Sequence, residues 1–362
     1  MITWVRASSE QSYAFRGGKD ATALSEWAGG ALIAAALLTG CDSQPETAKL
    51  TNNKVDAAAK AKADRAAKVK RAAAVKANEL GQIPVLMFHR IVPKPQTTDD
   101  RSPQQFRADL ERLVKEGYVP VSAAELVTGK IDIPAGKHPV VLTFDDSSPS
   151  QLTLNAMGVP QKDTAVAILK EVAAAHPGWK PKATFYVTRD MFGKTVREEQ
   201  AQALLWLKDN GFELGNHTRD HFNLRGRSQK EVEEQIGSIG KEIEALSYVK
   251  PVTIALPYGN QPNKKNWALR GKAYKHAGAF LAGYTPAPAP FSKAFDPAGI
   301  PRIKVMEKKG DCAQFCSEAW LDWLKKNPDM RYTSDGDPRT VAYPKFKAPS
   351  LRKAFATWSL PY

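Results

Sequence analysis

Short apolar strands alternate with longer helical segments from residue 83 to residue 326, and this alternation limits the fold more than any other feature of the chain. Strands are expected at 83–89, 118–121, 140–146, 183–187, 212–216, 252–256 and 280–284, and helices at 102–116, 123–127, 163–175, 198–210, 229–246, 265–276 and 311–326. The strands show little polar alternation, which indicates burial on both faces. Strands alternating with helices predict parallel βα units, and about seven units fit this span. We therefore predict one α/β domain, a (β/α)7-type barrel that is either complete or open.

Polar side chains of the kinds that bind metals or move protons follow several of these strands at their C-terminal ends. They are His89, Asp145, Asp146, His217, His221 and Tyr258. In a barrel of parallel strands the catalytic groups collect at this end of the strands. The beginnings of the same strands carry no comparable cluster. We therefore expect these side chains to share one face of the barrel.

A metal site is the first hypothesis for this face. Three residues separate His217 from His221, so one helical turn or a tight loop directs both imidazoles at one ion. A lone pair of this kind is as often two surface histidines. The pair Asp145-Asp146, at the end of another strand, supplies a carboxylate. Two histidines and a carboxylate form a facial metal site with open positions for water and substrate.

The charge of the chain is concentrated near its N-terminal part. The 362 residues are 43% hydrophobic and carry a formal net charge of +14. Residues 49–76 hold nine basic and two acidic side chains, which is half of that excess. A basic segment of this kind fits attraction to lipid headgroups or an anionic wall polymer. No stretch interleaves aromatic and basic residues, so we expect no nucleic-acid partner; the pattern predicts no particular oligomeric state.

The first 40 residues have the pattern of an export signal. An apolar run at 28–37 follows Arg16 and Lys19 and leads into Leu38-Thr39-Gly40-Cys41. A short apolar run before small residues is typical of a secretory signal, and the run is too short to span a bilayer. With Cys41 directly after the small residues, the segment resembles a bacterial lipoprotein signal in which Cys41 is lipidated. The alternative is a soluble leader that contains a cysteine.

Two further segments flank the predicted barrel. Residues 41–80 are rich in Ala, Lys and Arg and form no apolar stripe, so we interpret them as a partly helical tether outside the fold. The barrel itself is assigned to 81–330, and 331–362 is interpreted as a strap packed on it. Cys312 and Cys316 favour a disulfide in an exported protein. Two buried thiols are the alternative, because their spacing on an expected helix is awkward for a bridge.

Taken together, five short motifs resemble the polysaccharide deacetylases of carbohydrate esterase family four. The main motifs are Thr143-Phe144-Asp145-Asp146, His217-Thr218-Arg219-Asp220-His221 and Leu256-Pro257-Tyr258-Gly259, and the supporting ones are Met87-Phe88-His89-Arg90 and Ala183-Thr184-Phe185-Tyr186-Val187. Each motif alone is weak evidence, but their order and spacing at strand ends is specific. The resemblance covers most of residues 83–303 and implies a distorted (β/α)7 barrel.

The resemblance also implies a role for each site residue. Asp146, His217 and His221 would hold a divalent metal ion, usually zinc, that polarises the acetyl carbonyl and lowers the pKa of a bound water. Asp145 would be the base that takes a proton from that water. The backbone N–H of Tyr258, in a tight turn, would stabilise the oxyanion. The alternative interpretations are an ordinary loop or cap for the two aspartates and an ordinary turn at Tyr258.

The chain departs from the family pattern at three places. Ser147 follows the aspartate pair, where many family members have Gly. Ala255 stands two residues before the Pro, where many have the Arg that orients the base, so we expect the base to lack this partner. No Leu-x-His motif, which commonly holds the general acid, follows the barrel. Among the six histidines only His89 lies at a strand's C-terminal end without a metal role, so we nominate it as the acid; the alternative is that it only shapes the rim.

The expected function is hydrolysis of N-acetyl groups on an envelope or extracellular polysaccharide by an exported, membrane-anchored enzyme. An esterase for O-acetyl groups would use the same site. A glycan-binding lipoprotein that keeps the metal ligands but has lost turnover is a third interpretation, and a structural envelope lipoprotein is a fourth. Acetate release from acetylated polymers and metal content distinguish them.

Overall fold

A computed structural model describes residues 46–362, with side chains from residue 57 onward. Residues 57–362 form one compact unit. Cys41 and the predicted export signal lie outside the described residues. Within the described part, no helix combines the length and apolar character needed to cross a bilayer.

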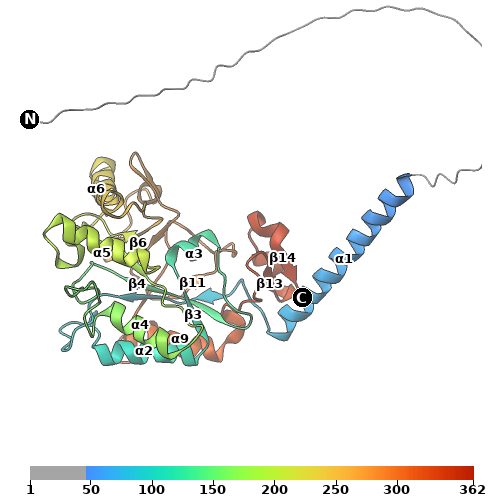
Figure 1. The fold of residues 1–362 in the computed structure, drawn as a ribbon, viewed down its shortest axis with the longest axis horizontal. Coiled ribbons are helices and arrows are strands. Elements are labelled where there is room, and N and C mark those ends of the chain that lie inside the picture. Colours follow the sequence, from blue (N-terminus) through green and yellow to red (C-terminus); the bar gives the residue numbers. More distant parts are fainter. Residues whose placement is uncertain (1–45) are drawn as a thin grey trace, which may run out of the picture. The chain divides into compact units, whose positions relative to one another are not determined.

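The centre of this unit is a curled, parallel sheet that forms a half-barrel, which confirms the predicted fold class (Figure 1). The strands follow the order β10-β7-β6-β5-β4-β2-β12, and β3 pairs with the first half of β4. Their bounds are β2 Val85–Phe88, β3 Tyr118–Val121, β4 His138–Phe144, β5 Thr184–Val187, β6 Glu213–Asn216, β7 Thr253–Ala255, β10 Gly278–Phe280 and β12 Ile303–Lys304. All of the pairings in this sheet are parallel, so the strand ends that carry the polar residues lie along one rim.

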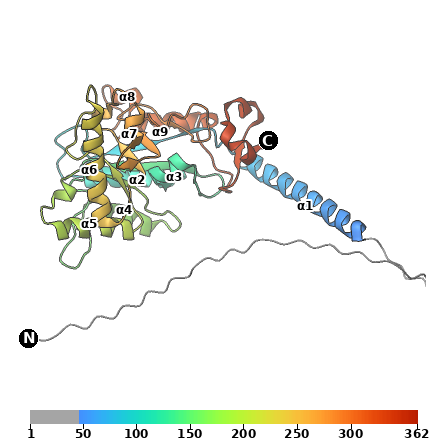
Figure 2. The same ribbon diagram turned by 90° about the horizontal axis from the view of Figure 1, so that it is seen from above.

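Helices cover the outside of the sheet. They are α2 Pro103–Lys115, α3 Ala123–Thr128, α4 Ala165–Ala175, α5 Arg197–Asp209, α6 Gln229–Ser247, α7 Asn266–Leu269, α8 Cys312–Phe315 and α9 Ser317–Lys326. Figure 1 shows α2, α4 and α9 together beneath the central strands, and Figure 2 shows α6 beside α5. The start of α2 is fixed by a capping box between Ser102 and Gln105 with Pro103 at the first position.

Alternate residues of the strands enter two different cores. The outward-facing set packs under the helices and contains a run of stacked rings, Phe88, Phe144 and Phe185. The inward-facing set includes Val141 and Tyr186 and fills the barrel. Because side chains alternate along a strand, Asp145 continues the inward register of Val141 and is carried into the barrel interior.

The N-terminal helix α1 (Glu46–Ala74) and the C-terminal segment pack together at one end of this unit. β13 (Val341–Tyr343) pairs with β14 (Ser359–Pro361), and Ala72 and Ala77 are buried against Ala342 and Leu360. Glu79 and Leu80 are also buried. The expectation that residues up to 80 lie outside the fold is therefore wrong for the last few of them, because small alanines let the helix end approach the strap closely.

Two further expectations about secondary structure meet different outcomes. The helix predicted at 265–276 is wrong: α7 ends at Leu269, and β8 (Arg270–Gly271) and β9 (Tyr274–Lys275) form a hairpin. Gly271 explains the difference, because a Cβ there would lie 2.5 Å from the ring of Tyr274.

The bridge between Cys312 and Cys316 is confirmed. The expected single helix breaks at Cys316, whose backbone is extended, and this break removes the conflict between the spacing and a disulfide. The remaining short strands are β1 (Gln82–Ile83) and β11 (Ala287–Pro288), which pair with each other.

Candidate active site

The two aspartates leave β4 in different directions. Asp145 continues into the barrel, and only 2% of its surface is exposed. Asp146 and Ser147 then adopt positive φ values of 73° and 46°, which turn the chain sharply at the rim. Such left-handed conformations are costly for residues other than Gly and concentrate at functional sites. The turn presents the carboxylate of Asp146 at the rim of the barrel.

Ser147 occupies this strained position where many family members have Gly. Its hydroxyl accepts a hydrogen bond from the backbone N–H of Thr188 at 3.2 Å and pairs with the hydroxyl of Thr188 at 3.1 Å. These bonds tie the turn after β4 to the residue that follows β5. They offset part of the conformational cost that Gly would avoid.

The two histidines reach the same rim from the loop after β6. The backbone turns back on itself because Thr218 and His221 both have positive φ. His217 is buried, and its Nδ1 donates to the carbonyl of Ala255 at 2.9 Å. His221 Nδ1 lies 3.2 Å from the hydroxyl of Tyr258. Both rings therefore turn their Nε2 atoms toward Asp146.

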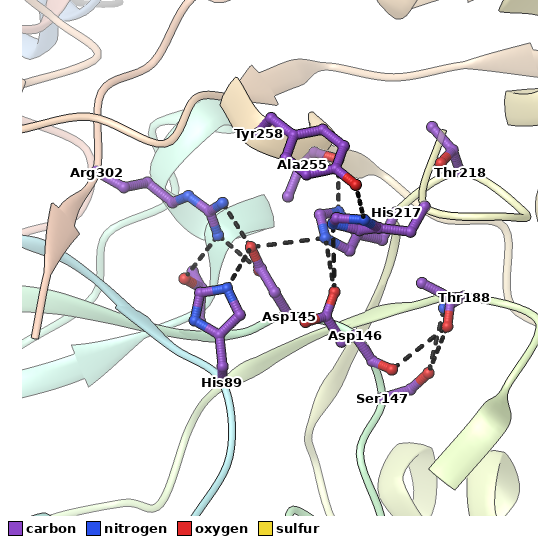
Figure 3. A network of polar contacts seen from close by, with 12 residues as sticks. His89, Asp145, Asp146, Ser147, Thr188, His217, Thr218, Ala255, Tyr258 and Arg302 are labelled. Atoms are coloured by element: carbon purple, nitrogen blue, oxygen red, sulfur yellow. Dashed lines mark hydrogen bonds and ion pairs between the residues drawn. The ribbon is translucent and has the colours of Figure 1, made fainter. Parts of the chain in front are cut away.

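Three ligand atoms converge at this point, one each from Asp146, His217 and His221. Figure 3 shows Asp146 and His217 facing each other. Oδ1 of Asp146 lies 3.3 Å from Nε2 of His217 and 3.5 Å from Nε2 of His221. Oδ1 of Asp146 and Nε2 of His217 are buried without a hydrogen-bond partner. A neutral His217 that donates from Nδ1 presents a lone pair at Nε2, so it faces a carboxylate oxygen with no hydrogen between them. A divalent cation fits this arrangement, because it would satisfy all three atoms at once.

Asp145 is held by an arginine that the sequence analysis did not assign to the site. Arg302, just before β12, is fully buried and makes two hydrogen bonds of 2.7 Å to the two carboxylate oxygens. Its Nε donates to the carbonyl of Leu281 and one of its terminal nitrogens to the hydroxyl of Thr143. Burial alone would raise the pKa of Asp145, but the positive charge of Arg302, the nearby His217 and the hydrogen bonds from Arg302 together outweigh burial and hold the pKa well below its usual range. The carboxylate is therefore ionised.

The expectation that the base lacks an orienting partner is wrong. Ala255 has no group to offer from its side chain, but Arg302 reaches Asp145 from a different strand of the sheet. The signal for this residue was present in the sequence. Arg302 lies between Ile300-Pro301 and Ile303, and an arginine in so apolar a stretch is buried only when it is paired.

His89 follows β2 at the same rim. Its Nε2 lies 4.0 Å from Oδ2 of Asp145, and its Nδ1 is buried without a partner. The other three histidines without a metal-facing atom lie elsewhere. His138 begins β4 at the opposite end of the barrel, and His176 ends α4 and pairs with Glu111. His276 follows β9 and donates from Nδ1 to the carbonyl of Ala268.

Tyr258 lies in a short 3-10 turn, Pro257–Gly259, after β7. Its φ of 59° is in the left-handed region, and no acceptor within residues 57–362 pairs with its backbone N–H. Gly259 is required behind it, since a Cβ would lie 2.6 Å from the backbone nitrogen of Ala282. The ring of Tyr258 stands 4.6 Å from that of His221, centroid to centroid. The turn therefore offers both a free N–H and a hydroxyl.

These residues surround one pocket of about 470 Å³. Asp145, Asp146, His217, His221, His89 and Tyr258 all line it. Met87, Leu256 and Ala282 give it apolar walls, a common character of sites for small organic groups. The structure thus brings every residue that the sequence singled out to a single cavity, and it adds Arg302 to them.

Comparison with known proteins points to the same family as the sequence motifs. Residues 132–277 match the family model described as polysaccharide deacetylase. No curated protein matches the chain. Among solved structures, a candidate polysaccharide deacetylase from Bacillus anthracis is 18% identical with a TM-score of 0.50, covering 65% of this chain and 69% of its own.

Two other solved structures are similar to the chain. The deacetylase PplD of Streptococcus pyogenes, solved with acetate, is 23% identical with a TM-score of 0.49, over 62% of this chain and 92% of that one. A polysaccharide deacetylase from Bacillus cereus is 19% identical with a TM-score of 0.48, over 62% and 64%. The matched residues 132–277 include both aspartates, both rim histidines and Tyr258. This segment, which is less than half of the chain, is the part that is similar to the polysaccharide deacetylase family.

Proposed function

We propose that this protein is a metal-dependent hydrolase that removes N-acetyl groups from a polysaccharide of the cell envelope or the extracellular space. Similarity to the deacetylase family supports a hydrolase for acetylated polysaccharide. The observation that carries the finer proposal is the convergence of Asp146, His217 and His221 beside an ionised, buried Asp145.

The three converging residues would hold a divalent ion, for which zinc is the best fit to two imidazoles and one carboxylate. When bound, such an ion polarises an acetyl carbonyl and lowers the pKa of water. The chain's own part is orientation. His217 is fixed by the carbonyl of Ala255, and His221 by the hydroxyl of Tyr258. These contacts keep both Nε2 lone pairs directed at the same point.

Asp145 acts as the general base in this proposal. Arg302 occupies one lone pair on each of its oxygens, which fixes the plane of the carboxylate and leaves the other lone pairs free. Oδ2 lies 3.7 Å from Nε2 of His217, so the base stands next to the ligand cluster. It takes a proton from the attacking water as the new C–O bond forms.

The remaining steps need an oxyanion donor and an acid. Tyr258 lines the pocket, and its free N–H would donate to the oxyanion. Amine departure needs a proton as the C–N bond breaks, and His89 is the candidate donor, 4.0 Å from Asp145. An acid in this position favours an amide over an ester substrate, because an alcohol leaves with less help.

Acetate release tests the proposal directly. The substrates are peptidoglycan, chitooligosaccharides, poly-N-acetylglucosamine and acetylated xylan, with zinc and with a chelator. Asp146→Ala and His217→Ala should lose the metal and the activity. Asp145→Asn and His89→Ala should keep the metal while kcat falls by about 10²–10⁴-fold.

Two variants serve as matched controls. Asp209→Asn lies at the exposed end of α5, and His176→Ala removes a surface contact with Glu111. Both should retain metal and activity. Full metal occupancy in Asp146→Ala and His217→Ala would contradict the assigned ligands. Acetate release from the xylan alone would contradict the amide substrate.

We also propose that the protein is exported and anchored to the bacterial envelope through lipidated Cys41. The support is the sequence at 28–41. The basic segment 49–76 would add attraction to anionic headgroups, and two such signals together give stable anchoring.

A further inference from the structure

A cluster of aromatic side chains lies beside the catalytic pocket and outside the matched residues 132–277. We call Tyr284, Phe315, Trp320 and Trp323 the aromatic rim. Tyr284 is 64% exposed and Phe315 47% exposed, and Trp323 is also exposed. Large apolar side chains that gather in solvent mark binding surfaces more often than scattered ones do.

The side chains of the aromatic rim are held in place by contacts within the protein. The rings of Tyr284 and Phe315 stand edge to face with their centroids 6.5 Å apart, and those of Trp320 and Trp323 do so at 5.4 Å. Trp320 donates from its indole N–H to the carbonyl of Tyr284 at 2.6 Å. The disulfide between Cys312 and Cys316 closes the short helix α8, which carries Phe315. Groups that are ordered in advance lose less entropy when a ligand binds.

The aromatic rim is continuous with the catalytic pocket. Tyr284 lines the pocket that holds the metal-ligand cluster, together with Ala282 and Gly283. The next residues, Thr285 and Pro286, line a second hollow of about 370 Å³ that Trp320 also borders. A chain molecule that leaves the pocket past Tyr284 therefore meets Trp320 next.

Charged side chains that line the catalytic pocket with Tyr284 are compensated within the protein. Arg90 makes two hydrogen bonds of 2.7 Å to Asp100, and Lys304 lies 2.8 Å from Asp99. An anionic polymer would have to compete with these carboxylates for the cations. A neutral polyol can instead use their remaining donors and acceptors, and the faces of its sugar rings are apolar enough to stack on aromatic rings.

We propose that the aromatic rim is a subsite for a neutral hexopyranose unit that neighbours the unit being deacetylated. The proposal rests on the proposed function for the identity of the reacting unit. It specifies the substrate as a neutral glycan chain rather than a single sugar or a polyanion. Tyr284 and Phe315 contact the neighbouring unit, and Trp320 and the disulfide hold them in place.

Binding without turnover tests the aromatic rim separately from catalysis. The probes are hexamers of N-acetylglucosamine with β-1,4 and with β-1,6 linkage, the corresponding dimers, and a sulfated hexamer. Affinity is measured by calorimetry on the full chain in a chelator, which stops turnover. Tyr284→Ala and Phe315→Ala should each weaken hexamer binding by about threefold to tenfold, since an aromatic contact of this kind is worth about that factor. In both variants the ratio of hexamer affinity to dimer affinity should fall together with the hexamer affinity.

Phe346→Ala is the matched control, because Phe346 is 71% exposed and lies in the C-terminal segment 345–350. It should bind the hexamers like the wild type. Equal hexamer and dimer affinity in the wild type, unchanged binding in both rim variants, or tighter binding of the sulfated hexamer would each overturn the proposal. Rim-dependent binding by a protein that releases no acetate from any of the acetylated polymers when zinc is present would instead contradict the proposed function and leave the aromatic rim standing.

Discussion

Replacing Arg302 with Met tests the buried pair on which the proposed base depends. Both partners are almost fully buried, and two hydrogen bonds of 2.7 Å join them. Removing one partner leaves an uncompensated charge in the interior, which typically costs about 3–5 kcal/mol. Arg302→Met should therefore lower the free energy of unfolding by about that amount and abolish acetate release.

The double variant separates the charge from the packing. In Asp145→Asn with Arg302→Met neither side chain is charged, so the desolvation cost disappears from both. Its loss of stability should be smaller than the sum of the two single losses by at least about 2 kcal/mol. The free energies come from chemical denaturation of metal-free protein, so that metal binding does not contribute.

Lys250→Met is the matched control for removing a cation. Lys250 pairs with Glu244 at the surface, and its side chain is largely exposed. An exposed pair of this kind is worth less than about 1 kcal/mol. If Arg302→Met cost no more than Lys250→Met, or if the two single losses simply added in the double variant, the buried pair would not hold the base as we argue.

Three other predictions concern Tyr258, Glu79 and Cys41. Tyr258→Phe removes the hydroxyl beside His221 and should weaken zinc binding by about 10–100-fold in a chelator competition, whereas Tyr248→Phe, at the exposed end of α6, should not. Burial raises the pKa of Glu79 to about 8, so the folded state keeps a proton that the unfolded state loses above pH 4.5. Stability should therefore fall between pH 4.5 and 8 by up to about 1.4 kcal/mol per pH unit, and Glu79→Gln should flatten this slope in denaturation measured at pH 5, 6.5 and 8. Cys41→Ser should release the protein from the membrane fraction of a bacterial host or leave it unprocessed; a wild-type protein without an acyl mass would contradict the anchor.

The sequence was sufficient for the fold class and for the residues that gather in the pocket. Buried parallel strands have short apolar signatures, and the polar residues directly after them share one rim whatever the details of the sheet. His217, His221 and Asp146 could be grouped for this reason. These three residues share the rim however strongly the strands curl.

Contacts between distant segments could not be predicted in this way. Arg302 and Asp145 are 157 residues apart, and neither segment has a local sequence feature that identifies the other as its partner. The end of α1 is buried because Ala342 and Leu360 of the C-terminal strap pack against it, not because α1 has an apolar stripe of its own. The hairpin after α7 depends on the room that Gly271 leaves for Tyr274, which a helical pattern does not reveal.

The tie between Asp145 and Arg302 also sets an order of events during synthesis. A growing chain has all three proposed metal ligands by residue 221, but Arg302, the counter-ion of the proposed base, follows only with the last strand of the sheet. Until β12 docks, burying Asp145 would cost the desolvation of a lone charge. Completion of the sheet and neutralisation of the buried charge on Asp145 thus occur together. A chain cut after residue 277 would keep the family's motifs but lack the counter-ion of the proposed base.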